Sequence, residues 1–237
     1  ILQHVFARSR SDEAIQGRNN QHWIASLPLV ARKDGREELR PRVFLGGNMR
    51  GLATLPLLKK VRPGDVVVLE LDSWQLQGFG EAKVRPHVAV FTTFYDDHLN
   101  YYKGDGEQYF LDKAQIFLHK PIRAASSMQQ AVSNALVVGG QAAPMIRKHF
   151  YAHAKRMVVA RSSDVPKGWK LAIPGEHNRY NAACALAAAD ALGVPRAVSK
   201  PAITTFRGLP GRLELVRELR GIKIYNDTCA TTPEATI

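Results

Sequence analysis

Short apolar runs rich in β-branched residues alternate along this chain with longer stretches of helix-forming residues. The clearest run, Asp65–Leu71, follows a Pro-Gly pair and predicts a strand that is buried on both faces. Three further strand-like runs are His87–Thr93, Arg156–Ala160 and Ile222–Tyr225. Helical patterns are found at Glu107–Leu118 and Asn181–Leu192. This alternation predicts an α/β fold, a mostly parallel open sheet flanked by helices, which binds ligands outside the carboxyl ends of its strands.

Composition narrows the class of protein further. The 237 residues include 45% hydrophobic residues and two cysteines, a globular composition that excludes a disordered tail, a collagen-like fibre and a disulfide framework. No apolar run approaches the roughly 20 residues of a membrane span. The first ten residues show neither a signal-peptide pattern nor an initiator Met, so we expect a cytoplasmic piece of a longer protein.

The charge balance requires a partner hypothesis. Lys and Arg number 33 against 21 Asp and Glu, which gives a formal net charge of +12. A field this positive attracts anions, and three classes remain open at this point: nucleic acid, anionic lipid or a small phosphorylated substrate.

Four residues stand out as candidates for chemistry. Glu70 lies inside an apolar run, where a carboxylate is costly unless it is hydrogen-bonded or binds a metal ion, and both alternatives stay open. His98 follows two acids beyond the next run; such turns usually cap helices, but with Glu70 it could bind a divalent ion. Lys113, taken alone, predicts a solvent-exposed side chain in a helix. Asp227 ends the last strand-like run, where doubly wound folds hold a ribose hydroxyl.

Seven ordered segments resemble the motifs of the Mur ligase family. They are Gly46–Asn48, Leu69–Leu76, Asp97–Leu99, Tyr109–Phe117, Gly175–Ala183, Gly208–Glu214 and Asn226–Thr236. Each motif alone is weak, whereas their common order over roughly residues 43 to 237 is specific. The Leu69–Leu76 and Gly208–Glu214 segments look most like the branch of the family that adds D-glutamate to UDP-N-acetylmuramoyl-L-alanine.

The resemblance implies a domain organisation and an activity. Residues 43–232 would form a P-loop NTPase-like central ATP-binding domain, after a divergent start at 1–42 and before a hinge at 233–237. The N-terminal UDP-binding domain and the C-terminal domain would lie outside the chain. The implied enzyme is a monomeric ATP- and Mg²⁺-dependent amide ligase of peptidoglycan precursor synthesis. Its partners would be UDP-N-acetylmuramoyl-L-alanine and D-glutamate, not nucleic acid or membrane, and these anionic substrates would suit the basic charge balance.

The resemblance also implies residue roles. The Mg²⁺ ligands would be Glu70, His98 and a carbamylated Lys113, and these three residues would form the catalytic centre. The carbamate would supply a carboxylate-like oxygen ligand. The muramoyl substrate would be contacted by Asn48, Ser73 and Gln75. The nucleotide would be contacted by Asn178 and Asn181 at the adenine and by Arg212 and Asp227 at the phosphates and ribose. Thr231 would lie near the D-glutamate end of the site.

The chain departs from the family pattern at the phosphate loop. No TGTxGK[ST] segment is present, and the candidate by position, Gly17–Leu27, has Arg18 in place of the phosphate-binding Lys. Gly211 and Cys229 stand where the family has His and Lys. We therefore expect that the chain alone does not turn over. The alternative is a non-catalytic nucleotide- or UDP-sugar-binding module on the same fold.

Overall fold

The computed structural model describes residues 41–49, 53–121 and 135–230. Its central sheet contains three parallel strands in the order β4-β6-β7, where β4 is Val88–Phe91, β6 is Ala135–Gly139 and β7 is Met157–Ala160. Two further parallel pairs are β1 (Val43–Gly47) with β2 (Val66–Glu70) and β3 (Val84–Arg85) with β5 (Lys120–Pro121). The predicted mostly parallel α/β architecture is confirmed.

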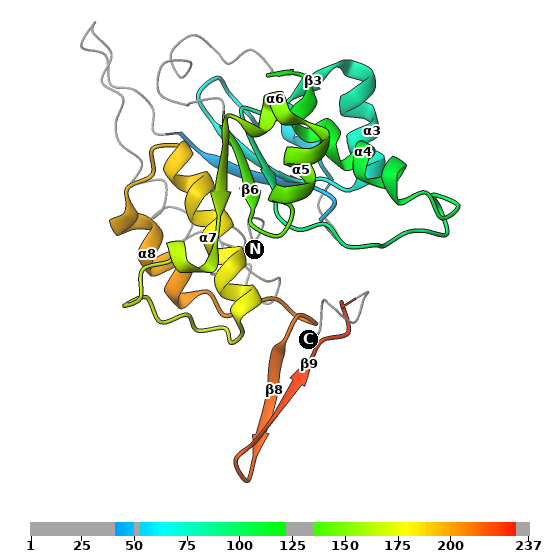
Figure 1. The fold of residues 1–237 in the computed structure, drawn as a ribbon. Coiled ribbons are helices and arrows are strands. Elements are labelled where there is room, and N and C mark those ends of the chain that lie inside the picture. The colour runs from blue at the N-terminus through cyan, green and yellow to red at the C-terminus, as the bar shows by residue number, and fades with distance from the viewer. Residues whose placement is uncertain (1–40, 50–52, 122–134, 231–237) are drawn as a thin grey trace, which may run out of the picture.

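Helices cover both faces of the central sheet (Figure 1). One layer holds α3 (Ser73–Ala82), α4 (Gly106–Leu118), α5 (Ala143–His149) and the short α6 (Tyr151–Ala154); the other holds α7 (Glu176–Ala191) and α8 (Arg196–Thr205). The 3₁₀ turns are η1 (Leu55–Lys59) and η2 (Ser162–Asp164). In β6, Leu136 and Val138 pack with α4 and α5, whereas Val137 packs with α7. Alternate side chains of one buried strand therefore hold the two layers together.

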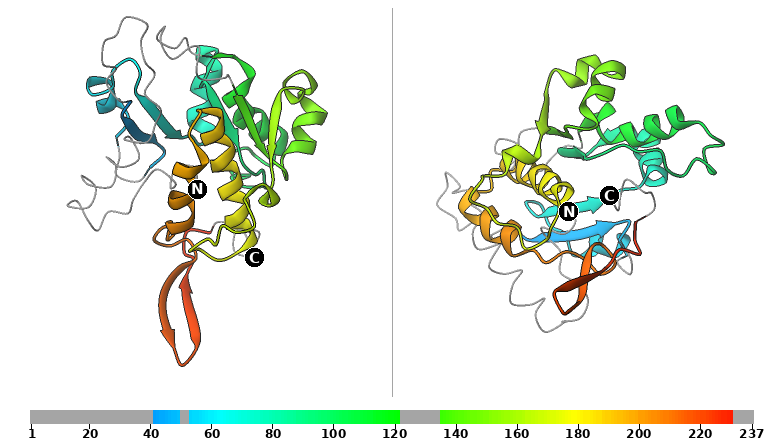
Figure 2. Two further views of the ribbon diagram at one scale, coloured as in Figure 1. Left: turned by 90° about the vertical axis from the view of Figure 1, so that its left-hand side faces the viewer. Right: turned by 60° about the horizontal axis from the view of Figure 1, so that its bottom comes forward.

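Two expectations about strands are wrong. β2 is not buried on both faces: Val67 is 39% and Leu69 36% exposed, and these alternate residues lie on one face of the strand. The last strand-like run is β9 (Ile222–Asn226), which pairs antiparallel with β8 (Glu214–Leu219) in a projecting hairpin (Figure 2). Asp227 thus follows a hairpin strand and not a strand of a doubly wound sheet, so that argument for a ribose site fails.

Several predictions lie outside the described residues. They concern Arg18, Thr231, the divergent start up to residue 40 and the hinge at 233–237.

The end of β1 lies unusually close to the end of β2. Gly47 has a positive φ of +87°, and a Cβ added there would stand 1.8 Å from the carbonyl oxygen of Glu70. The next residue, Asn48, donates its backbone N–H to that same carbonyl at 2.7 Å. Only glycine allows this approach, so Gly47 determines where the backbone of Glu70 can lie.

We predict that Gly47→Ala destabilises the chain far more than Gly64→Ala. Both glycines have positive φ, but a Cβ at Gly64 would meet nothing within 4 Å. Gly64→Ala should cost about 1 kcal/mol from its φ alone, whereas Gly47→Ala adds a backbone collision and should cost about 3 kcal/mol or more. Urea unfolding measures both, and equal losses would contradict the close approach.

Candidate functional site

The carboxyl ends of β1 and β2 present the first group of candidate residues. Glu70 is the last residue of β2, and the capping residue of α3, Asp72, follows it by two positions. Asp72 Oδ1 accepts a hydrogen bond from the Gln75 backbone at 2.8 Å, and Gln75 Oε1 accepts one from the Asp72 backbone at 3.3 Å. This reciprocal capping box fixes the start of α3 next to the carboxylate of Glu70.

The segment after β4 places His98 beside α3 and α4. His98 has a φ of +55° and donates its backbone N–H to Asp97 Oδ1 at 2.7 Å. Its ring lies edge-on to Trp74 of α3, with centroids 4.9 Å apart, and 5.9 Å from the ring of Tyr109. The Nζ of Lys113 stands 4.9 Å from the centre of the Tyr109 ring. His98 and Lys113 therefore share one aromatic neighbour.

Burial acts on both ionisable groups at the centre of this region. It raises the pKa of Glu70, and the positive charges of Arg212 and Lys113 oppose that rise. It lowers the pKa of Lys113, and the negative charges of Asp97, Asp72 and Glu70 oppose that fall. The structure therefore brings Glu70, Lys113 and Arg212 within electrostatic reach of one another.

Lys113 is not the solvent-exposed helix residue that its position alone predicts. It is half-buried, and its lowered pKa increases the fraction of neutral amine. A carbamate forms only from a neutral amine, so the environment suits the predicted modification. The carbamylation itself stays a prediction.

The described residues offer few donor atoms for a metal ion. Within the described ranges, no three His, Cys, Asp or Glu side chains stand close enough to hold a metal ion. Mg²⁺ prefers oxygen ligands and commonly combines one or two carboxylates with substrate phosphates and water. Glu70, a Lys113 carbamate and nucleotide phosphates would supply that set, so the residues fit Mg²⁺ only with the modification and the nucleotide included.

The predicted nucleotide residues come from α7 and from the base of the hairpin. The hydroxyl of Tyr180 donates to the Thr92 carbonyl at 2.8 Å, which holds the first turns of α7, and with them Asn178 and Asn181, at the carboxyl end of β4. Asn178 itself donates to the Pro174 carbonyl at 2.6 Å.

At the hairpin base, one carboxylate oxygen of Asp227 lacks a partner. Asp227 Oδ1 accepts from the Leu213 backbone at 3.1 Å, but Oδ2 is buried without a hydrogen-bond partner among the described residues. A buried acceptor of this kind is costly unless a ligand donor reaches it. The expectation of a ribose contact at Asp227 therefore keeps a physical basis although its topological argument failed.

The predicted substrate contacts differ in accessibility. Ser73 is only 1% exposed in the first turn of α3, whereas Gln75 is exposed and its Oε1 serves the capping box. Asn48 is exposed and directly follows β1. Sequence reasoning also missed residues that shape the site, chiefly Trp74, Tyr109 and Asp112. The helical spacing of Gln108, Asp112 and the tyrosines was the available signal, but it does not distinguish a buried acid from a solvated one.

The two departures from the family pattern near the hairpin are neighbours in space. Gly211 is buried with a φ of +73°, and its carbonyl accepts from the Cys229 backbone at 2.9 Å. A Cβ at position 211 would meet the Cys229 Sγ at 2.8 Å. A larger residue at position 211 would therefore require the Cys229 side chain to shift in this structure.

We predict that Glu70→Gln stabilises the chain at pH 7. The raised pKa means that the folded state binds this proton more tightly than the unfolded state, so the stability due to Glu70 is full below its ordinary value of 4.5 and falls as pH rises through the folded pKa. Gln stays neutral throughout. Thermal unfolding should show a rise of roughly 2–4 °C at pH 7 that disappears below pH 4.5; a lower melting temperature at pH 7 would contradict it.

Comparisons with known proteins identify a family and several relatives. The family description "Mur ligase middle domain" matches residues 52–189. The chain is 34% identical over 226 residues to the UDP-N-acetylmuramoylalanine–D-glutamate ligase of Roseiflexus sp. (strain RS-1), covering 83% of this chain and 46% of the relative. It is 31% identical over 204 residues to the UDP-N-acetylmuramoyl-L-alanine–L-glutamate ligase of Xanthomonas axonopodis pv. citri (strain 306), covering 83% and 42%. The chain thus spans about half the length of the curated relatives it matches.

A solved structure supports the fold. MurF from Acinetobacter baumannii superposes with a TM-score of 0.54 and 18% identity, over 82% of this chain and 52% of that chain. Within the part of the chain that the structure describes, no helix combines the length and apolar character needed to cross a bilayer. From the matched residues, the ordered motifs and this fold, the chain belongs to the Mur ligase family.

Proposed function

We propose that this chain is the nucleotide-binding part of an ATP-dependent amide ligase that adds glutamate to UDP-N-acetylmuramoyl-L-alanine in peptidoglycan precursor synthesis. The observation that carries the proposal is the desolvated Lys113 amine within electrostatic reach of the Glu70 carboxylate. A buried Lys whose pKa is lowered is rare away from functional sites. The names of the relatives in the previous subsection support the reaction class.

The proposed reaction activates the substrate carboxylate with the γ-phosphate of ATP and then transfers the acyl group to the amine of glutamate. Charge develops on phosphoryl oxygens, so the protein mainly has to position reactants and supply positive charge. Mg²⁺, when bound, would neutralise phosphate charge. Glu70 and a carbamate on Lys113 would hold it, with His98 beside them, and Arg212 would face the phosphates. Asn178, Asn181 and Asp227 would bind the nucleoside, and Asn48 and Gln75 the muramoyl substrate.

The proposal includes the domain assignment and the setting. Residues 43–232 would form the central domain. The UDP group and glutamate would be bound by parts of the relatives that lie outside the region matched by this chain. We place the reaction in the cytoplasm and the enzyme as a monomer. The relatives include both D-glutamate and L-glutamate ligases, so the stereochemistry of the amino acid is left to experiment.

We predict that the chain binds a non-hydrolysable ATP analogue in the presence of Mg²⁺ with micromolar affinity, about 8 kcal/mol. Glu70→Ala should abolish this binding because it removes a metal ligand. Glu107→Gln, which removes an exposed acid from α4, should leave it unchanged. Isothermal titration calorimetry on the three proteins decides: no binding by the unsubstituted chain would reject a nucleotide site.

We further predict that the chain alone does not release phosphate from ATP with the substrates present. Ligases of this kind assemble their site by domain closure, and only about half of the relatives' length is present. A coupled phosphate-release assay should give the same rate for the chain and for Lys113→Ala. Substrate-dependent release above that control would contradict the prediction, and it would also exclude the non-catalytic binding module.

A further inference from the structure

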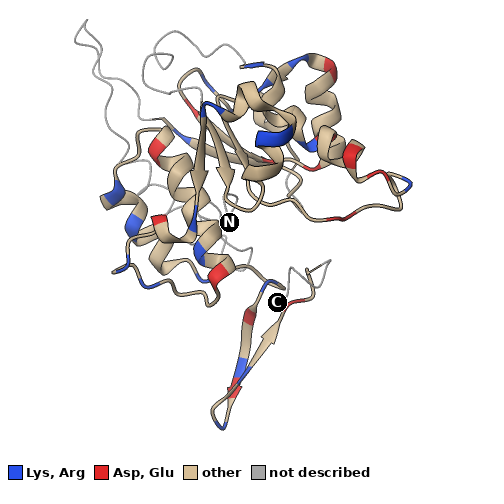
Figure 3. Cartoon of the chain, in the orientation of Figure 1, with Lys and Arg blue, Asp and Glu red and all other residues tan. Residues whose placement is uncertain are grey.

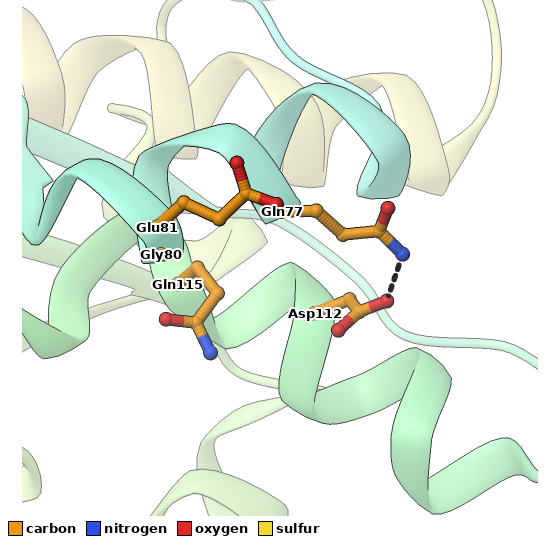
Figure 4. A pocket seen from close by; sticks show the side chains of 5 residues that line it. All are labelled: Gln77, Gly80, Glu81, Asp112 and Gln115. Atoms are coloured by element: carbon orange, nitrogen blue, oxygen red, sulfur yellow. Dashed lines mark hydrogen bonds between the residues drawn. The ribbon is translucent and has the colours of Figure 1, made fainter.

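Asp112 is a buried acid that the proposed chemistry does not use. It is 6% exposed, and its carboxylate accepts three side-chain hydrogen bonds. Gln77 Nε2 donates to Oδ2 at 2.6 Å, the Tyr102 hydroxyl donates to Oδ2 at 3.0 Å, and Gln108 Nε2 donates to Oδ1 at 2.7 Å. The first of these bonds is drawn in Figure 4. A carboxylate this buried is costly, so three well-placed donors indicate a site built to hold it.

The groove beside Asp112 is not a second binding site. It has a volume of about 360 Å³ between α3 and α4, and polar side chains line it (Figure 4). Both carboxylate oxygens of Asp112 are already occupied by protein donors. The walls of the groove also touch: a Cβ at Gly80 of α3 would stand 2.8 Å from the Gln115 Oε1 of α4. The region is therefore a closely packed contact between two helices.

The three donors come from three different parts of the site. Gln77 belongs to α3, whose capping box starts two residues after Glu70. Tyr102 belongs to the segment of His98 and donates its backbone N–H to the His98 carbonyl at 3.2 Å. Gln108 belongs to α4, which also carries Lys113, the residue next to Asp112.

We propose that Asp112 is a positioning residue that fixes the segments of Glu70, His98 and Lys113 relative to one another. Without its carboxylate, α3 and the His98 segment lose their common link to α4, and the candidate metal ligands lose their relative placement. Asp112 would act through these segments and not by contact with a substrate. The inference rests on the proposed function, because the purpose of the placement is a metal–nucleotide site.

The test compares Asp112→Asn with a control on the same helix. Asp112→Asn removes the negative charge and replaces one acceptor oxygen by an NH₂ donor, so the three charge-assisted hydrogen bonds are lost and at least one partner has to reorient. Asp105→Ala removes the cap of α4, because the Asp105 carboxylate accepts a hydrogen bond from the Gln108 backbone at 2.8 Å, and it should lower the melting temperature by a similar amount. A double variant, Gln77→Glu with Asp112→Asn, reverses donor and acceptor between α3 and α4 and should restore their link.

Two measurements are made on each protein. Calorimetry with Mg²⁺ and a non-hydrolysable ATP analogue should show about tenfold weaker binding for Asp112→Asn, or 1.4 kcal/mol. It should also show recovery in the double variant and less than a twofold change for Asp105→Ala. Acetylation of Lys113 at one fixed pH, followed by mass spectrometry without nucleotide, should be several-fold faster in Asp112→Asn only.

The outcomes separate the two proposals. The positioning role would be overturned if Asp112→Asn bound the nucleotide and were acetylated at Lys113 as the unsubstituted chain is. It would also be overturned if Asp105→Ala lost as much nucleotide affinity as Asp112→Asn. If even the unsubstituted chain binds no nucleotide, the proposed function fails, and the Lys113 labelling rates still decide whether Asp112 fixes the placement of that lysine.

Discussion

The desolvation of Glu70 and Lys113 is the constraint on which the rest of this site depends. Burial pushes both groups toward their neutral forms, and the surrounding charges only partly oppose it. Neither effect favours the fold, so the arrangement is retained at a cost in stability. The close approach at Gly47, the capping box of α3 and the carboxylate of Asp112 all hold these two residues in place. A cost in stability of this kind is expected at a functional site.

Much of the fold was predictable because local pattern and tertiary structure agree there. The apolar runs of β2, β4 and β7 and the helix α4 were located to within about two residues, since each strand is a short run of apolar, mostly β-branched residues bounded by polar residues or Pro-Gly, and α4 has helical spacing. β9 was located to within one residue, but its place in an antiparallel hairpin was not predicted, because a short alternating run does not reveal its partner. β8 and β9 form an antiparallel hairpin joined at Arg220 and Gly221, both with positive φ.

The sequence predicted which residues form the candidate site, but not how buried they are or what surrounds them. The motifs identified Glu70, His98 and Lys113. In the structure His98 and Lys113 share the neighbour Tyr109, and Glu70 lies within electrostatic reach of Lys113. Burial could not be predicted from the motifs. Ser73 and Asp112 are polar residues that a helix normally exposes, and only the packing of α3 against α4 encloses them. The same applies to Gly211 and Cys229, which are separated by 18 positions in sequence but are in contact in the fold.

Within the described residues, one dense group of positive charges lies away from the candidate site. A dense basic run, Arg147–Arg156, ends α5 and precedes β7, which places it at the amino edge of the parallel sheet, opposite the carboxyl ends (Figure 3). At the carboxyl ends, the acids Glu70, Asp72 and Asp97 act on Lys113, and Glu70 also lies within electrostatic reach of Arg212. Carbamylation of Lys113 would make this region more negative still. A nucleoside triphosphate would then be repelled unless a divalent cation were bound to it. The local electrostatics therefore favour the metal–nucleotide complex over the free nucleotide.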